Sequence, residues 1–120
     1  MELSIITALM QPTIPSVLII NDWGVITNGI IKRFQCGKAS IEFRMCFMDG
    51  VWKGAYSVTG RTCGMGCPLS RSDSGFPTLE LCLDHVCENV KRYVRTSIPD
   101  SYNKTFQTLE KWKESNYKLD

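Results

Sequence analysis

The sequence contains a single histidine, His85, and little excess of either charge, with 14 basic and 12 acidic residues among 120. A net charge of +2 is too small to indicate binding to nucleic acid or to a membrane by charge alone. No stretch reaches the ~18 apolar residues that a membrane-spanning helix needs. The N-terminus lacks a basic start, and Pro12 and Pro15 interrupt its apolar run. We therefore expect no secretion signal, no membrane partner and a cytoplasmic location.

The shortage of histidine also limits the catalytic chemistry that the chain could support. His85 has Asp84 and Glu88 around it on the expected polar face of a helix, so a solvated histidine is favoured over a catalytic one. No Ser/His/Asp arrangement can be assigned. The glycine-bearing segment 60–66 matches neither the P-loop nor the dinucleotide-binding fingerprint. We expect a protein that is not an enzyme and that holds no cofactor, apart from the zinc alternative below.

The clearest pattern is a β-hairpin over residues 41–58. Apolar residues alternate with others from Ile41 to Phe47, which is the period of a strand with one apolar face. Asp49-Gly50 follows, a dipeptide that accepts the positive φ angles of a type I′ turn. One face of the return strand is expected to carry Trp52, Gly54, Tyr56 and Val58.

Residues 79–94 have the period of an amphipathic helix. Pro77 ends the preceding loop, and Thr78 can cap the first turn. Leu81 is the one apolar residue on the predicted polar face, which also includes Lys91. The apolar face, which we expect to lie across the sheet, carries Leu79, Cys82, Leu83, Val86, Cys87, Val90, Tyr93 and Val94.

Further segments are predicted to complete the sheet. Residues 3–10 and 17–20 are short apolar or β-branched runs that we interpret as strands. Residues 25–27 and 30–32 flank Asn28-Gly29, a typical turn dipeptide, and so predict a second hairpin.

A second helix is expected to begin near Pro99, which suits a first helical turn. Its apolar stripe is predicted to comprise Tyr102, Phe106, Leu109 and Trp112. Together these elements predict a single domain over residues 1–120 with an α+β fold. We expect an antiparallel sheet of four to five strands with two amphipathic helices packed on one face.

The six cysteines allow three interpretations. They are Cys36, Cys46, Cys63, Cys67, Cys82 and Cys87. Free thiols are favoured because cytosolic redox chemistry keeps cysteines reduced. An even count in a short chain also permits disulfides, as in a secreted, disulfide-stapled effector.

Structural zinc is the third interpretation, because thiolates are suitable zinc ligands. Cys63 and Cys67 lie in a glycine-rich loop, and Cys82 follows nearby in sequence. His85 and Cys87 cannot join one site, because they point about 160° apart on a helix. The candidate metal set is therefore Cys63, Cys67 and Cys82, with one ligand missing.

Seven of the 14 basic residues lie in the part of the chain expected to form the sheet, and some of them indicate a candidate partner-binding surface. The 59–76 loop carries Arg61 and Arg71, and loops on a rigid scaffold commonly make binding contacts. Arg44 and Lys53, on the two hairpin strands, complete the candidate set.

The hairpin also offers a nucleic-acid alternative. Phe43, Trp52 and Tyr56 alternate with basic residues, which is the raw material of a sheet face that binds nucleic acid. A helix-covered aromatic face is favoured over that alternative, because the 79–94 helix needs a surface to pack on.

The segment 50–57, then Pro68-Leu69-Ser70, then Phe76-Pro77-Thr78 before a helix, resembles small phage- and prophage-encoded accessory domains. Those domains have a strand containing Trp, Gly and Tyr-Ser, a Gly/Pro loop and a Phe-Pro-Ser/Thr helix start. The resemblance spans residues 41–95, and Ala55 departs from it by separating Gly54 from Tyr56. It implies a small accessory protein that acts in the host cytoplasm and binds a host protein complex, in the manner of an anti-CRISPR protein.

The leading hypothesis is therefore a noncatalytic protein-binding module that inhibits a host defence or nucleic-acid-processing complex. A zinc-containing or sheet-face nucleic-acid-binding viral regulator is one alternative. A secreted disulfide-stapled effector is another.

Overall fold

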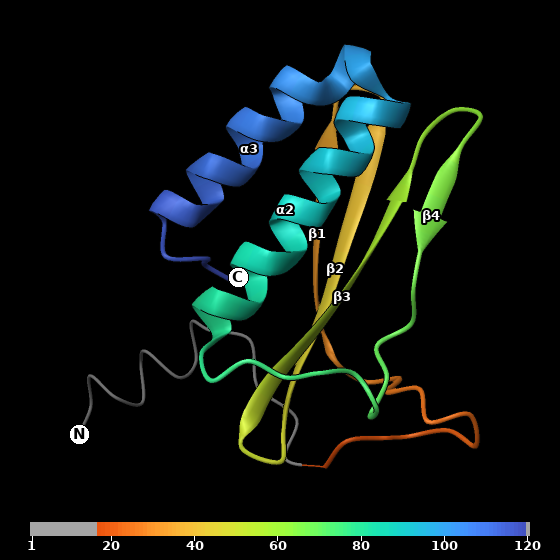
Figure 1. The fold of residues 1–120 in the computed structure, drawn as a ribbon, viewed down its shortest axis with the longest axis vertical. Coiled ribbons are helices and arrows are strands. Elements are labelled where there is room, and N and C mark those ends of the chain that lie inside the picture. Colours follow the sequence, from red (N-terminus) through yellow and green to blue (C-terminus); the bar gives the residue numbers. More distant parts are fainter. Residues whose placement is uncertain (1–16, 120) are drawn as a thin grey trace.

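The computed structural model describes residues 17–119, and these form a four-stranded antiparallel sheet with two helices on one of its faces (Figure 1). The strands follow one another in the sheet in chain order. They are β1 (Ile30–Cys36), β2 (Ala39–Met48), β3 (Val51–Thr59) and β4 (Gly64–Gly66). The predicted α+β class is confirmed. The expected strand over residues 3–10 lies outside the described residues.

The predicted 41–58 hairpin is confirmed in its register and its turn. Phe43 pairs with Tyr56, and Met48 pairs with Val51 across a two-residue connection. Asp49 and Gly50 have φ angles of 55° and 79°, as a type I′ turn requires. The turn therefore places the apolar sets of both strands on the same side of the sheet.

The predicted hairpin about Asn28-Gly29 is wrong. The β1–β2 hairpin turns instead at Gly37-Lys38, where Cys36 pairs with Ala39 and Gly37 has a φ of 61°. The Asn28 side chain accepts a hydrogen bond from Ile19 N at 2.7 Å and donates one to Val17 O at 2.8 Å. The Asn28 side chain therefore holds residues 17–19 next to it. Residues 25–27 and 30–32, on either side of Asn28-Gly29, do not pair with each other.

Both helices cover the face of the sheet that carries Phe43 (Figure 1). Helix α2 (Leu79–Ser97) begins at Thr78, whose side chain accepts a hydrogen bond from Leu81 N at 3.2 Å. A 3-10 turn, η1 (Pro99–Ser101), leads into α3 (Tyr102–Glu114). The core between the layers includes Ile41, Phe43, Met45, Val58, Leu83, Val86, Val90, Val94, Leu109 and Trp112.

The apolar stripe predicted for the last helix is rotated in the structure. Leu109 and Trp112 are buried as expected, but Thr105 takes the third inward position and Phe106 is 43% exposed. Lys91, predicted on the polar face of α2, is also buried. It lies between the helices, because its Nζ bonds Glu110 Oε1 at 2.5 Å and sits 4.9 Å from the Phe106 ring centroid.

A second, smaller apolar cluster lies on the opposite face of the sheet. It consists of Ile26, Cys46, Ala55 and Leu69. Cys46 and Ala55 come from β2 and β3, and the segments before β1 and after β4 add Ile26 and Leu69, which are joined by a hydrogen bond from Ile26 N to Leu69 O at 2.7 Å. None of the helices within residues 17–119 is long and apolar enough to cross a membrane.

Candidate partner-binding surfaces

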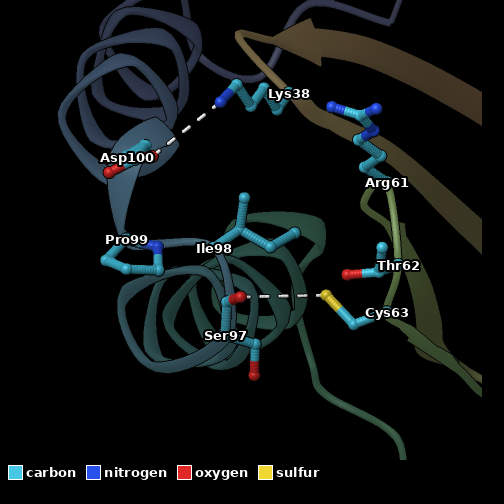
Figure 2. Close-up of a pocket in the computed structure, with 8 residues that line it drawn as sticks. All are labelled: Lys38, Arg61, Thr62, Cys63, Ser97, Ile98, Pro99 and Asp100. Carbon is cyan, nitrogen blue, oxygen red and sulfur yellow. Dashed lines mark hydrogen bonds and ion pairs between the residues drawn. The ribbon is translucent and has the colours of Figure 1, made fainter.

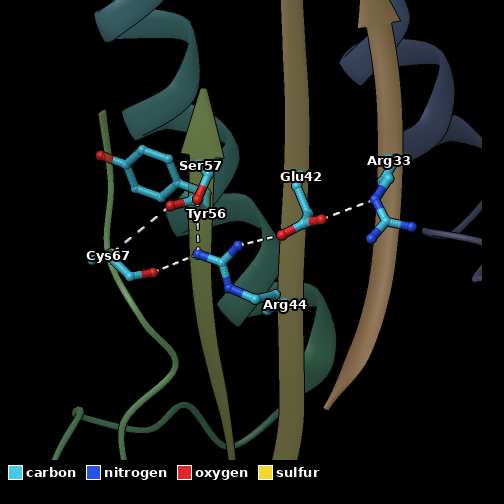
Figure 3. A network of polar contacts seen from close by, with 6 residues as sticks. All are labelled: Arg33, Glu42, Arg44, Tyr56, Ser57 and Cys67. Atoms are coloured by element: carbon cyan, nitrogen blue, oxygen red, sulfur yellow. Dashed lines mark hydrogen bonds and ion pairs between the residues drawn. The ribbon is translucent and has the colours of Figure 1, made fainter. Parts of the chain in front are cut away.

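The predicted binding residue Arg44 belongs to a polar network on the helix-free face of the sheet (Figure 3). Its guanidinium donates to Glu42 Oε2 at 2.5 Å, to Ser57 Oγ at 2.9 Å and to Cys67 O at 2.5 Å. Arg33 Nε donates to the other oxygen of Glu42 at 2.8 Å. Arg44 thereby links β2 to β3 and to the segment after β4, so its side chain stabilises the fold.

Two guanidinium groups share the one Glu42 carboxylate. Partial burial acts to raise the pKa of Glu42, but the hydrogen bonds and charges of Arg44 and Arg33 outweigh it and lower that pKa. Arg33 remains 70% exposed at its side chain, against 19% for Arg44. Of the two, Arg33 is therefore the one that a partner could reach, and the sequence analysis did not select it.

Lys53 and Arg71 lie close together, but the contact between them stabilises the fold and does not form an open binding site. Lys53 is buried, and its Nζ donates to the backbone oxygen of Arg71. The Arg71 side chain lies against Gly24, where an added Cβ would come 3.4 Å from Nε. Lys53 therefore anchors the 67–76 segment to β3, and only Arg71 presents an exposed side chain.

Arg61 lies at the other end of β3, beside a pocket of about 190 Å³ (Figure 2). The pocket is lined by Lys38, Arg61, Thr62, Cys63, Ser97, Ile98, Pro99 and Asp100. Lys38 Nζ lies 3.9 Å from Asp100 Oδ2 across its mouth. Since Arg61 and Lys53 flank six residues of extended strand, they lie on the order of 20 Å apart. The four predicted binding residues therefore do not form one site.

The 59–76 segment is also more ordered than the predicted loop. Its residues Gly64–Gly66 form β4, which pairs with β3 through Ser57–Thr59. Val25 and Ser70 form an isolated bridge, and so do Trp52 and Phe76. The segment is thus fastened to the sheet along most of its length.

The cysteines are free thiols, and the predicted zinc set is not brought together. Cys63 Sγ lies 3.7 Å from Ser97 O at the end of α2, whereas Cys82 is buried in the first turns of that helix. Fifteen helical residues separate these ends by about 22 Å. Within residues 17–119, no group of three or more His, Cys, Asp or Glu side chains could hold a metal ion.

The aromatic side chains of the hairpin do not form an open binding face for nucleic acid. Phe43 is fully buried beneath the helices, and Trp52 and Tyr56 are packed against the same core. The helix-covered interpretation is thus the one that the structure supports.

A cluster that the sequence analysis did not identify lies where β2 and β3 extend past the first turn of α2. We call it the aromatic patch and define it as Phe47, Trp52, Phe76, Leu81 and His85. The ring centroids of Phe47 and Trp52 are 5.4 Å apart, and those of Phe76 and His85 are 5.2 Å apart. Backbone hydrogen bonds of 2.8 Å join Trp52 to Phe76 in both directions.

The aromatic patch is accessible from solvent. Phe47 is 46% exposed and Leu81 49% exposed. Leu81 precedes His85 by four residues, so both lie on the same side of α2. One signal in the sequence pointed here, namely that Leu81 breaks the polar face of its helix. The alternation in β2 did not reveal the exposure of Phe47, because it does not show how far the helices reach along the sheet.

No protein-family model, curated protein or solved structure matches this chain. The candidate surfaces are therefore ranked by their geometry alone. Arg44 and Lys53 stabilise the fold, while the aromatic patch combines the exposed Phe47 with half-buried rings whose backbone is hydrogen-bonded.

Proposed function

We propose that this chain is a noncatalytic protein-binding module of a phage or other mobile element, which inhibits a host defence or nucleic-acid-processing complex by binding it. The aromatic patch is the observation that carries the proposal. Binding energy in protein interfaces is concentrated in a few residues, among which aromatic ones are enriched. The exposed Phe47 ring beside Trp52, and the Phe76–His85 ring pair next to it, give such a centre here, with the exposed Leu81 one helical turn from His85.

The patch is also held in place before any partner arrives. Phe47 and Trp52 are paired on adjacent strands. The backbone of Phe76 is hydrogen-bonded to the backbone of Trp52. His85 stands on α2, where its ring nitrogen lies 3.3 Å from Asn89 Nδ2. A surface that is already ordered loses less conformational entropy on binding, which favours affinity.

The resemblance of residues 41–95 to phage-encoded domains suggests where to look for the partner. A tagged full-length chain would be used to capture a complex from a bacterial lysate, and the affinity for the purified complex would then be measured by calorimetry. The test variant is Phe47→Glu/Leu81→Glu, which places two charges in the patch without removing a buried side chain. We expect its Kd to be raised at least about a hundredfold.

Met65→Glu is the matched control, because Met65 is 44% exposed on β4 and receives the same charge. We expect it to bind like the wild type. A complex that binds the double variant as tightly as the wild type would rule out the patch. Turnover of a substrate that depends on one particular side chain would overturn the noncatalytic assignment.

A further inference from the structure

A pocket of about 200 Å³ is lined by residues from both α2 and the start of α3, which lie side by side (Figure 1). Pockets that enclose a whole drug-sized molecule are larger, at roughly 300–1,000 Å³. The space therefore suits one ring with one charged substituent. The lining consists of Glu88, Lys91, Arg92, Arg95, Tyr102 and Phe106.

The charges of this pocket are divided between a paired cluster and two exposed guanidinium groups. Lys91 is buried, and its Nζ bonds Glu110 Oε1 at 2.5 Å and Glu88 Oε1 at 3.3 Å. Arg92 and Arg95 are exposed, and neither forms an ion pair within the described part of the chain. Three cations against two carboxylates leave the site positive, so it favours an anionic ligand.

The two arginines are placed to bind one anion together. Arg92 and Arg95 are three residues apart on α2, so their Cβ atoms lie about 5–6 Å apart on the same side of the helix. Each guanidinium is a planar fork of N–H donors that binds anionic oxygens in pairs. One fork uses both oxygens of a carboxylate, whereas the three oxygens of a phosphoryl group can accept from two forks at once. The pair therefore favours a phosphoryl group.

Two aromatic rings form the α3 side of the pocket. The ring centroids of Tyr102 and Phe106 are 6.2 Å apart, and the ring planes are inclined by 43°. Lys91 Nζ lies 4.9 Å from the Phe106 centroid, and Phe106 remains 43% exposed. Part of the Phe106 ring is therefore open to a ring of the ligand, since aromatic pairs attract one another beyond the area that they bury.

We propose that this pocket binds a phosphomonoester group carried directly on an aromatic ring. The phosphoryl oxygens accept hydrogen bonds from Arg92 and Arg95, and the attached ring packs against Phe106. A phosphorylated tyrosine of a protein and a free aryl phosphate share this chemistry. Arg92 follows His85 by seven residues, which is about 10 Å along α2, so the site does not depend on the aromatic patch or on the proposed function.

The test titrates the full chain with phenyl phosphate and follows the amide chemical shifts. We expect shifts confined to residues 88–95 and 102–106, and a Kd at least about fivefold below that of inorganic phosphate, because the ring adds a contact. Benzoate carries the same ring on a carboxylate and should bind at least about tenfold more weakly. Shifts located elsewhere, or equal affinities for phenyl phosphate and benzoate, would overturn the proposal. Tighter binding of adenosine monophosphate would also overturn it, in favour of a nucleotide site.

A short phosphotyrosine peptide, with alanine on either side and both ends blocked, separates the two sources of the ligand. A peptide Kd below that of phenyl phosphate would identify a protein side chain as the ligand. A peptide Kd equal to or above that of phenyl phosphate would identify a free aryl phosphate.

Three variants check the two halves of the pocket. Arg92→Gln/Arg95→Gln removes both guanidinium groups from exposed positions and should raise the Kd of phenyl phosphate at least about tenfold. Arg71→Gln removes an exposed guanidinium from the other end of the molecule and should leave that Kd unchanged. Phe106→Leu should abolish the preference for phenyl phosphate over inorganic phosphate while leaving inorganic phosphate bound as before. Unchanged binding of phenyl phosphate by the double variant would rule out the site.

Discussion

The phenolic hydroxyl of Tyr117 donates a hydrogen bond to Asp84 Oδ1 and so joins the segment after α3 to α2. Tyr117 is only 4% exposed, and its ring packs edge to face on Trp112. Lys113 Nζ lies 3.4 Å from the same Asp84 oxygen. The contact therefore fixes α3 and the residues after it against the helix that carries the core.

Replacing Tyr117 by Phe should destabilise the protein while preserving the packing of the ring. The change removes the hydroxyl donor, so the partly buried carboxylate of Asp84 loses one hydrogen bond. We expect the free energy of unfolding to fall by about 1–2 kcal/mol, measured by urea denaturation. Tyr102→Phe is the control, because the structure shows no hydrogen bond of that hydroxyl to residues 17–119. An equal loss in both variants would contradict the assigned contact.

Glu42 should make part of the stability depend on pH. Its pKa is lowered in the folded chain below the ordinary value of 4.5, so the unfolded chain takes up a proton first as pH falls. The contribution is therefore present above pH 4.5 and is lost as pH falls through the lowered pKa. Glu42→Gln should cost about 1 kcal/mol at pH 7 and flatten the acid limb of the stability curve.

The measurement is urea denaturation of both proteins at several pH values from neutral to acid. Glu114→Gln removes the same charge from an exposed position with no ion pair to residues 17–119, and it serves as the control. Parallel curves for wild type and Glu42→Gln would show that the Arg33–Glu42–Arg44 network does not contribute to stability.

The parts of the fold that the sequence predicts well are those set by local chemistry. The Asp49-Gly50 turn and the Thr78 cap each act on neighbouring backbone groups, and both were predicted correctly. Asn28-Gly29 has equally typical turn chemistry, yet its side chain bonds back to residues 17–19 instead. The inward face of α3 was predicted incorrectly, because Thr105 is buried there and Phe106 lies instead beside Lys91, which is paired with Glu110 19 residues away in sequence.

The candidate site was harder to predict, because exposure depends on contacts between distant segments. Arg44 and Lys53 are basic residues on strands, but backbone oxygens of Cys67 and Arg71 engage them in the fold. Phe47 has the alternation of a core residue and is nevertheless 46% exposed. Only the arrangement of the layers shows which charges serve the fold and which rings reach solvent.

Thiol reactivity should divide the cysteines into two groups. Cys67 is exposed and Cys63 is half-buried, whereas Cys36, Cys46, Cys82 and Cys87 are buried. Burial raises the pKa of Cys82 to about 11 and that of Cys87 to about 12, which further suppresses their thiolates. A thiol reagent should modify two cysteines quickly in the native protein and all six in denaturant. Rapid modification of all six would contradict the described core.

Close packing of Cys82 against β3 gives the sharpest test of the helix–sheet interface. A Cβ added at Gly54 would come 2.7 Å from Cys82 Sγ and 3.5 Å from Val86 Cγ1. Gly54→Ala must therefore displace the start of α2 or a buried thiol, and we expect a loss of about 1–3 kcal/mol in the free energy of unfolding.

The same argument predicts that the penalty depends on the sulfur atom. In a Cys82→Ala background the closest neighbour is gone, so Gly54→Ala should cost less there than in the wild type. A double-mutant cycle by urea denaturation measures this difference, and we expect a coupling of about 1 kcal/mol in favour of the double variant. If the two losses in the free energy of unfolding simply add, Cys82 does not pack against Gly54. The assigned packing of α2 on β3 would then be wrong.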